Sequence, residues 1–166
     1  MSPQPSLSLP PRVRPDSASL LARAASGLEA GVVGGLAMLS VLIVFSLLRG
    51  RVWWETPNLL GSTFYGLRAF RSGVSMATLS GVAFHLVITG TVGVVFGLLC
   101  GAMAGRSRLL FVGIAAGVFW YYLANVLLWR QINPLIPLYT FVPAALASHG
   151  VFGACLGWMG QKNWFS

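Results

Sequence analysis

The sequence predicts an all-α integral membrane protein built as a four-helix bundle. Only 8% of its 166 residues are charged, whereas a soluble domain carries about 25%. Hydrophobic residues make up 56% of the chain, and they gather in four long runs. Each run is close to the roughly 20 residues that a helix needs to cross a hydrocarbon core about 30 Å thick. A water-facing surface cannot be built from this composition, so the runs are expected to cross a membrane.

The first 26 residues are predicted to form a tail that is disordered or lies at the membrane interface. Residues 1–20 are rich in serine and proline and show no apolar period, a composition typical of disorder. The stretch 17–30 could form a short interfacial helix. We therefore expect the transmembrane domain to occupy 27–166.

Four spans are predicted within this domain. They cover about 28–49, 75–101, 109–129 and 139–160. An even number of spans places both chain ends on one side of the membrane, called side A here, and the opposite surface is side B. Pro143 near the start of the fourth span is compatible with a first helical turn, because its missing N–H would have no partner there.

The link between the first two spans, 50–74, is the longest and is expected to lie at the bilayer surface. It combines aromatic residues such as Trp53 and Trp54 with arginines such as Arg68, which is typical of the membrane interface. The other two links are short, which predicts that consecutive spans are antiparallel neighbours.

The net charge of +8 does not indicate nucleic-acid binding, because the basic residues lie in the breaks between apolar runs, where lipid headgroups would be. Side A would hold Arg12, Arg14, Arg23, Arg106, Arg108 and Lys162, and side B would hold Arg49, Arg51, Arg68, Arg71 and Arg130. This near balance gives little orientation signal. We expect a bacterial inner membrane with side A, and so the N-terminus, in the cytoplasm.

Glycines recur at intervals of four residues along the spans, and we interpret them as helix contacts. They are Gly31, Gly35, Gly93, Gly97, Gly101, Gly113, Gly117, Gly153 and Gly157. Helices in lipid associate by close packing, which favours small residues where they meet. Since every span carries such a face, the sequence predicts contacts with other membrane subunits or with further copies of the chain, in addition to the lipid bilayer. The expected role is a non-catalytic accessory or packing subunit of a membrane complex, or a small homo-oligomer.

The only two histidines, His85 and His149, interrupt these glycine faces. An imidazole facing lipid would lack a partner at considerable cost, so both are expected to point inward. Each lies about ten residues into its span, roughly 15 Å from side B at 1.5 Å per residue. Tyr121 and Asn125 of the third span would lie roughly 12 and 6 Å from the same surface. The four side chains are therefore predicted to share one half of the bundle.

Two interpretations of the histidines remain open. In the first they are structural, each donating a hydrogen bond that is worth about 0.6 kcal/mol on average within membrane helices, and no cofactor is expected. In the second, His85 and His149 ligate the iron of haem b from opposite faces, and the chain is an electron-transfer subunit.

A third hypothesis is a proton-coupled transporter or channel that uses Glu29, the only acid near a span. The alternative is that Glu29 lies in the first turn of its helix, where a carboxylate is favoured by the helix dipole. Soluble catalysis is not indicated, since the sequence shows no nucleophile–base pair, paired carboxylates, phosphate loop or metal motif. Cys100 and Cys155 are interpreted as small buried hydrophobes.

Overall fold

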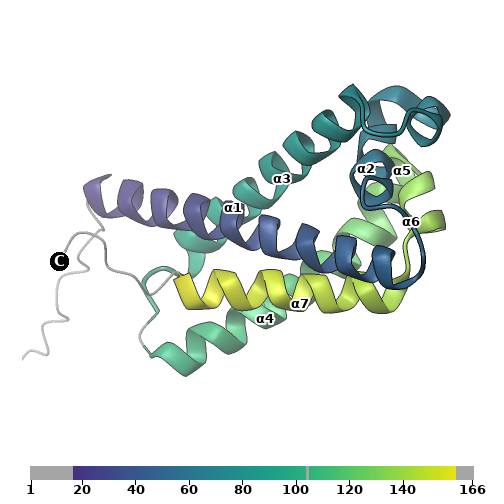
Figure 1. The fold of residues 1–166 in the computed structure, drawn as a ribbon. Helices are drawn as coiled ribbons and strands as arrows, with labels where there is room; N and C mark the ends of the chain where they lie inside the picture. The colour runs from purple at the N-terminus through teal and green to yellow at the C-terminus, as the bar shows by residue number, and fades with distance from the viewer. Residues whose placement is uncertain (1–16, 104, 160–166) are drawn as a thin grey trace, which may run out of the picture.

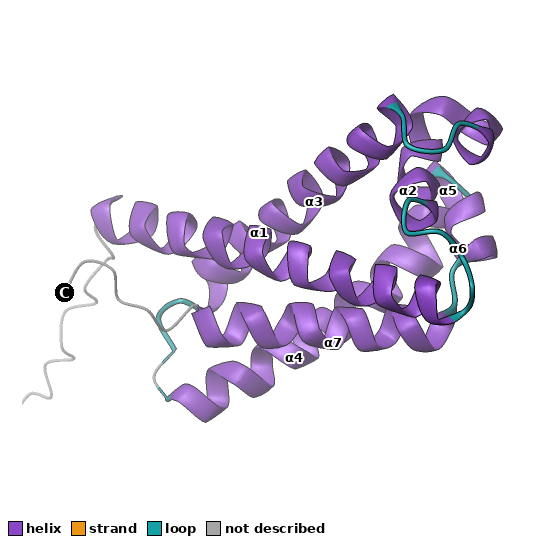
Figure 2. Cartoon of the chain, in the orientation of Figure 1, coloured by secondary structure: helices purple, strands orange, loops and turns teal. Residues whose placement is uncertain are grey.

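The computed structural model of the protein describes residues 17–103 and 105–159, and every regular element within them is helical (Figure 2). The elements are α1 (Ser17–Leu48), α2 (Glu55–Tyr65), the 3₁₀-helix η1 (Gly66–Arg71), α3 (Met76–Cys100), α4 (Arg106–Tyr122), the π-helix η2 (Leu123–Leu128), α5 (Trp129–Ile132), α6 (Leu135–Tyr139) and α7 (Val142–Met159). Helices α4, η2 and α5 follow one another without a break.

Four of these helical stretches are long and apolar enough to cross a membrane: α1, α3, the continuous Arg106–Ile132 stretch and α7. The predicted all-α membrane bundle is confirmed, and the chain is a small multi-pass membrane protein. Side A is the end of the bundle where α1 begins and α7 ends (left in Figure 1), and side B is the opposite end.

Helix α1 begins earlier than the apolar pattern predicts. It starts at Ser17, so 17–26 of the predicted tail is helical, while residues 1–16 lie outside the described part. Its 32 residues span about 48 Å at 1.5 Å per residue, more than a hydrocarbon core requires. Glu29 therefore lies well inside the helix and not in its first turn.

The four long helices form an open layer in the order α3, α1, α7, α4. Helix α1 packs against α3 and α7, and α4 packs along α7 (Figure 1). Helices α3 and α4 scarcely touch although a short link joins them, so the expectation that consecutive spans are neighbours is wrong for this pair. The reason lies in the glycine faces, which match α3 to α1 and α4 to α7.

Helices α1 and α3 meet backbone to backbone. A Cβ atom on Gly93 would lie against the carbonyl oxygen of Gly27 and 2.6 Å from the Cα atom of Gly31. One turn away, a Cβ atom on Gly97 would meet the carbonyl oxygen of Arg23 and lie 3.0 Å from Gly27 Cα. Only glycine permits this separation, because any side chain would collide with main-chain atoms that cannot rotate away.

Helices α4 and α7 meet in the same way. A Cβ atom on Gly113 would meet the main chain of Gly153 and Gly157, and one on Gly117 would meet the carbonyl oxygen of His149. Gly150, on another face of α7, has open space around it. The internal fold thus uses glycine faces on all four spans.

An apolar cluster fills the half of the bundle nearer side A. Its buried members are Ala30, Met38, Phe96, Leu109, Phe152 and Leu156. Phe152 and Leu156 are completely buried, so this half contains closely packed side chains from all four long helices.

At side B, α3 diverges from α1 and α7, and α2, α5 and α6 lie in the widening space (Figure 1). The segment between α1 and α3 is thus packed into this end of the bundle. Asn58 of α2 is 2% exposed and donates to the carbonyl oxygens of Ala69 (2.9 Å) and Gly73 (2.7 Å), while it accepts from the Thr78 hydroxyl. This one side chain fixes α2, η1 and the start of α3 against one another.

Asn133, in the link before α6, provides the second anchor of this end. It is 5% exposed and donates to the hydroxyl oxygens of Ser62 (2.8 Å) and Thr63 (3.1 Å) on α2. Together the two asparagines hold α2 and the α5–α6 region as a fixed cover on side B.

Candidate functional site, an internal cavity at side B

A cavity of about 120 Å³ lies beneath this cover. Its walls come from α1, α2, α3, η2, α7 and the segments between them. The side chains of His85, Asn125 and His149 all line it, so three of the four residues that the sequence placed in one half of the bundle reach a common space.

His85 of α3 joins two helices. Its ring is 6% exposed, and Nε2 lies 2.9 Å from the carbonyl oxygen of Gly35 on α1. A carbonyl oxygen can only accept, so Nε2 carries the proton and donates. The Thr89 hydroxyl, one turn along α3, donates to the carbonyl oxygen of His85 at 3.0 Å.

His149 of α7 bonds within its own helix. Its Nδ1 lies 2.7 Å from the carbonyl oxygen of Ala145, and its ring is 5% exposed. The Tyr121 ring meets the imidazole edge to face, with ring centroids 5.2 Å apart. Nδ1 therefore carries the proton in His149, whereas Nε2 carries it in His85. Tyr121 orients the His149 ring but is not a wall of the cavity.

Asn125 lies in the π-helix, where the backbone widens by one residue per turn. The N–H of Trp129 bonds to the carbonyl oxygen of Ala124 in the i to i+5 pattern. Such widened turns are frequent at functional sites in helices. The Asn125 amide donates to the carbonyl oxygen of Tyr121 at 3.1 Å, which leaves Oδ1 of this cavity-lining residue as an acceptor.

Within 17–103 and 105–159, the second ring nitrogen of each histidine has no hydrogen-bond partner. No fully enclosed side-chain nitrogen or oxygen in this part of the chain lacks a partner, so these two nitrogens are not fully enclosed, and both residues line the cavity. An imidazolium there would need a counter-charge, and the only carboxylate on the wall, Glu55, is paired at the mouth. In the neutral rings, His85 Nδ1 and His149 Nε2 are hydrogen-bond acceptors.

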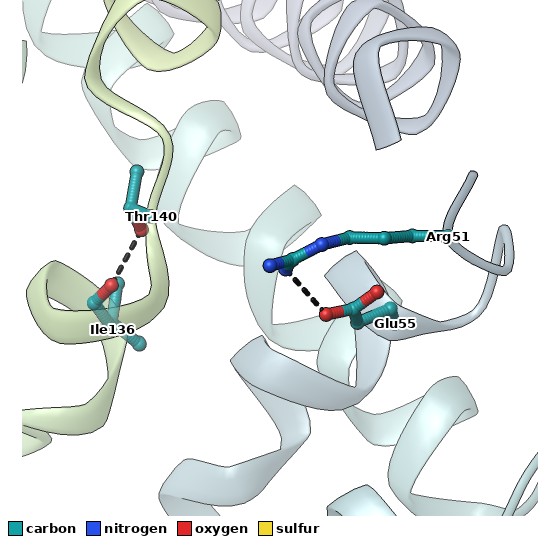
Figure 3. Close-up of polar contacts among 4 residues, drawn as sticks. All are labelled: Arg51, Glu55, Ile136 and Thr140. Atoms are coloured by element: carbon teal, nitrogen blue, oxygen red, sulfur yellow. Dashed lines mark hydrogen bonds and ion pairs between the residues drawn. The ribbon is translucent and has the colours of Figure 1, made fainter. Parts of the chain in front are cut away.

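The mouth of the cavity at side B carries the charged groups. Arg51, in the link after α1, reaches Glu55 of α2 at 2.6 Å, while Thr140 and Ile136 lie on the opposite side (Figure 3). Arg49 stacks over the Phe141 ring, 4.2 Å from its centroid. The Arg51–Glu55 pair is partly exposed, and a pair of this kind contributes only about 0–1 kcal/mol. It can open at little cost.

Toward side A the cavity ends at the apolar cluster. Met38 belongs to the cluster and also lines the cavity. The cavity therefore ends in apolar side chains toward side A, while its charged lining residues lie at side B.

No protein-family model, curated protein or solved structure matches this chain. The candidate site is thus interpreted from its geometry alone.

The remaining candidate groups lie away from the cavity. Glu29 is exposed on the outer face of α1 and is not a wall residue. Cys100 and Cys155 are free thiols that are partly buried. Within 17–103 and 105–159, no group of three or more histidine, cysteine or acidic side chains is arranged to hold a metal ion.

Haem ligation by His85 and His149 stays a prediction. The volume of the cavity shows what binding a haem would require. The cavity of about 120 Å³ is slightly smaller than the engineered cavity of about 150 Å³ that holds one benzene molecule in another protein. A macrocycle would require the helices to separate.

Sequence reasoning did not identify Asn58, Asn133 or the Arg51–Glu55 pair. The i to i+4 spacing of Arg51 and Glu55 was not a usable signal, because that rule applies within a helix and Arg51 lies in the link before α2. The two asparagines gave none, because isolated amides in links between spans are equally compatible with exposed turns.

Proposed function

We propose that this membrane protein binds a small molecule in its internal cavity and receives it from side B. The observation that carries the proposal is that His85 and His149 each give one ring nitrogen to a main-chain carbonyl and that both residues line one common space. A carbonyl bond of this kind fixes the tautomer and the ring orientation, as in pre-arranged ligand sites.

A purely structural role would explain one histidine better than the other. The bond from His85 to Gly35 joins α3 to α1 and is the inter-helix bond that the structural interpretation expects. The bond from His149 to Ala145 joins no two helices. A leucine would fill that space without leaving an acceptor open to the cavity, so ligand binding accounts for His149 more directly.

The accessory-subunit and homo-oligomer hypotheses remain predictions with less support. They depended on glycine faces that needed partners outside the chain, whereas those faces meet one another inside the bundle. A transporter using Glu29 is likewise less favoured, because that side chain lies outside the cavity. We retain a bacterial inner membrane, with side A cytoplasmic, as the proposed location.

Thiol accessibility tests the proposal. In a background without Cys100 and Cys155, single cysteines are introduced as Ser46→Cys and Ala144→Cys in the cavity wall, and as Ala30→Cys in the apolar cluster as control. A small membrane-impermeant thiol reagent added from side B should modify both wall positions and spare the control. From side A it should modify none.

The same labelling reports orientation, because intact cells of a bacterial host expose the periplasmic surface after outer-membrane permeabilisation. Labelling of the wall positions there places side B in the periplasm. An Ala144→Cys variant that resists the reagent from side B would overturn the proposed site.

A further inference from the structure

We infer that the ligand is a neutral molecule about one ring in size that carries a hydroxyl donor, with phenol as its simplest representative. This inference rests on the proposed function and specifies its ligand. Four properties of the cavity select this chemistry: its size, the free acceptors on its deep wall, the placement of charge at its mouth, and its aromatic side chains.

The size of the cavity limits the ligand. A volume of about 120 Å³ is close to that which holds a single benzene ring, about 150 Å³. Ordinary ligand pockets for drug-sized molecules are larger, about 300–1,000 Å³. A single six-membered ring is therefore near the upper limit, while the cavity exceeds what one water molecule occupies.

The deep wall of the cavity, formed by His85, Thr89, Asn125 and His149, offers more free acceptors than free donors. The single N–H of each neutral imidazole bonds to a main-chain carbonyl, and so do one of the two N–H groups of Asn125 and the Thr89 hydroxyl. Three acceptors remain on these side chains, His85 Nδ1, His149 Nε2 and Asn125 Oδ1, together with one donor, the second N–H of Asn125. Trp120 and Trp129, which also line the cavity, carry one indole N–H each. A ligand that itself only accepts would leave all three acceptors unpaired, whereas a hydroxyl group donates its one proton to one of them and can accept from a donor on the wall.

The charges exclude ions. Glu55 is the only carboxylate on the wall and is held by Arg51 at the mouth, where Arg49 adds a positive charge. A cation in the deep part would therefore be buried without a counter-charge, which is costly. An anion there would face three acceptors. A neutral donor avoids both penalties.

Aromatic side chains favour a ring over an aliphatic alcohol. Trp120, Trp129 and Phe45 line the cavity. Their faces and edges suit the offset and edge-to-face contacts that aromatic rings prefer. An aromatic ring also loses little conformational freedom when it binds, because it has few rotatable bonds.

The test compares matched probes on the purified full chain in detergent. Because the chain has only two histidines, labelling with ¹⁵N-histidine gives signals from these two rings alone, and titrating each probe gives its affinity at the site. We expect phenol to bind at least about tenfold more tightly than toluene, which has the same shape without the donor. Benzoate and benzylammonium should bind more weakly than phenol.

Two variants remove the bare ring nitrogen while keeping the structural bond. In His85→Gln the side-chain amide can reproduce the donor at Nε2 toward Gly35, and in His149→Asn it can reproduce the donor at Nδ1 toward Ala145. Because the phenol hydroxyl carries one proton, the variant that removes its acceptor should lower phenol affinity about tenfold, followed through the remaining labelled ring, and neither variant should change toluene affinity. Phenol affinity unchanged in both variants would overturn the inference. Gly150→Ala, outside the cavity, should change neither affinity.

The outcomes separate this inference from the proposed function. Equal binding of phenol and toluene, or tighter binding of benzoate or benzylammonium, would overturn the ligand chemistry while the cavity remained a binding site. If no probe perturbs either ring although a thiol reagent reaches Ala144→Cys, the one-ring ligand is wrong and the side B opening still stands. Failure of the thiol labelling would overturn the proposed function itself.

Discussion

The close approach of α1 and α3 makes Gly93→Ala the most informative single change. A Cβ atom at this position would lie against Gly27 and only 2.6 Å from Gly31 Cα, about 1 Å inside the usual separation of about 3.5–4.0 Å between carbon atoms. Both obstacles are main-chain atoms, so the helices themselves must separate. Overpacking of this kind costs about 1–3 kcal/mol.

Gly150→Ala is the matched control, because it adds the same methyl group to a membrane-spanning helix where nothing lies within 4 Å. Both changes gain the preference of alanine over glycine in helices, up to about 1 kcal/mol. The difference between them isolates the steric term. Unfolding by SDS in mixed micelles, followed by circular dichroism, should show Gly93→Ala about 1–3 kcal/mol less stable than Gly150→Ala, a factor of about 5 to 150 in the unfolding equilibrium. Equal stabilities would refute the backbone contact between α1 and α3.

Three further changes test the cover, the mouth and the alternative function. Asn58→Ala removes a buried side chain that satisfies two carbonyls and a hydroxyl. It should lower the free energy of unfolding by about 2–4 kcal/mol in the same assay and speed hydrogen exchange in the cover. Unchanged hydrogen exchange would contradict the role of Asn58 as an anchor. Glu55→Gln releases Arg51 at the mouth. The free energy of unfolding should change by less than about 1 kcal/mol, while thiol labelling of the cavity wall becomes faster. Slower labelling would contradict the proposal that the Arg51–Glu55 pair lies at the entrance to the cavity. Glu29→Gln, outside the cavity, should leave probe affinity unchanged, and a loss of affinity would revive the hypothesis that uses this acid.

The number of spans was predictable because it follows from composition and run length, which a bilayer constrains strongly. The inward position of His85 and His149 was also predictable, because both interrupt faces of small residues. In the structure both side chains are buried. The pairing of the helices was not, because a short link between α3 and α4 suggested neighbours that scarcely touch. Complementary glycine spacing on α1 and α3 decides the arrangement, and sequence alone does not say which two glycine faces meet.

The start of α1 and the cover on side B were also beyond the hydrophobic pattern. Residues 17–26 are helical because the helix continues past the apolar run, and a search for apolar periodicity stops where the run stops. Asn58 and Asn133 act through partners up to 71 residues away in the chain, a relation that local spacing cannot reveal. The π-helix at Leu123–Leu128 has no recognised sequence signal in this chain.

The protonated positions of the two imidazoles test the central claim most directly. Nitrogen chemical shifts of the ¹⁵N-histidine-labelled protein in bilayers should show one protonated and one bare nitrogen in each ring, with the proton on Nε2 in His85 and on Nδ1 in His149, as their carbonyl bonds require. Both bare nitrogens should respond to solutes added at side B. The same protonated position in both rings, or bare nitrogens that no solute reaches, would contradict the binding site described above.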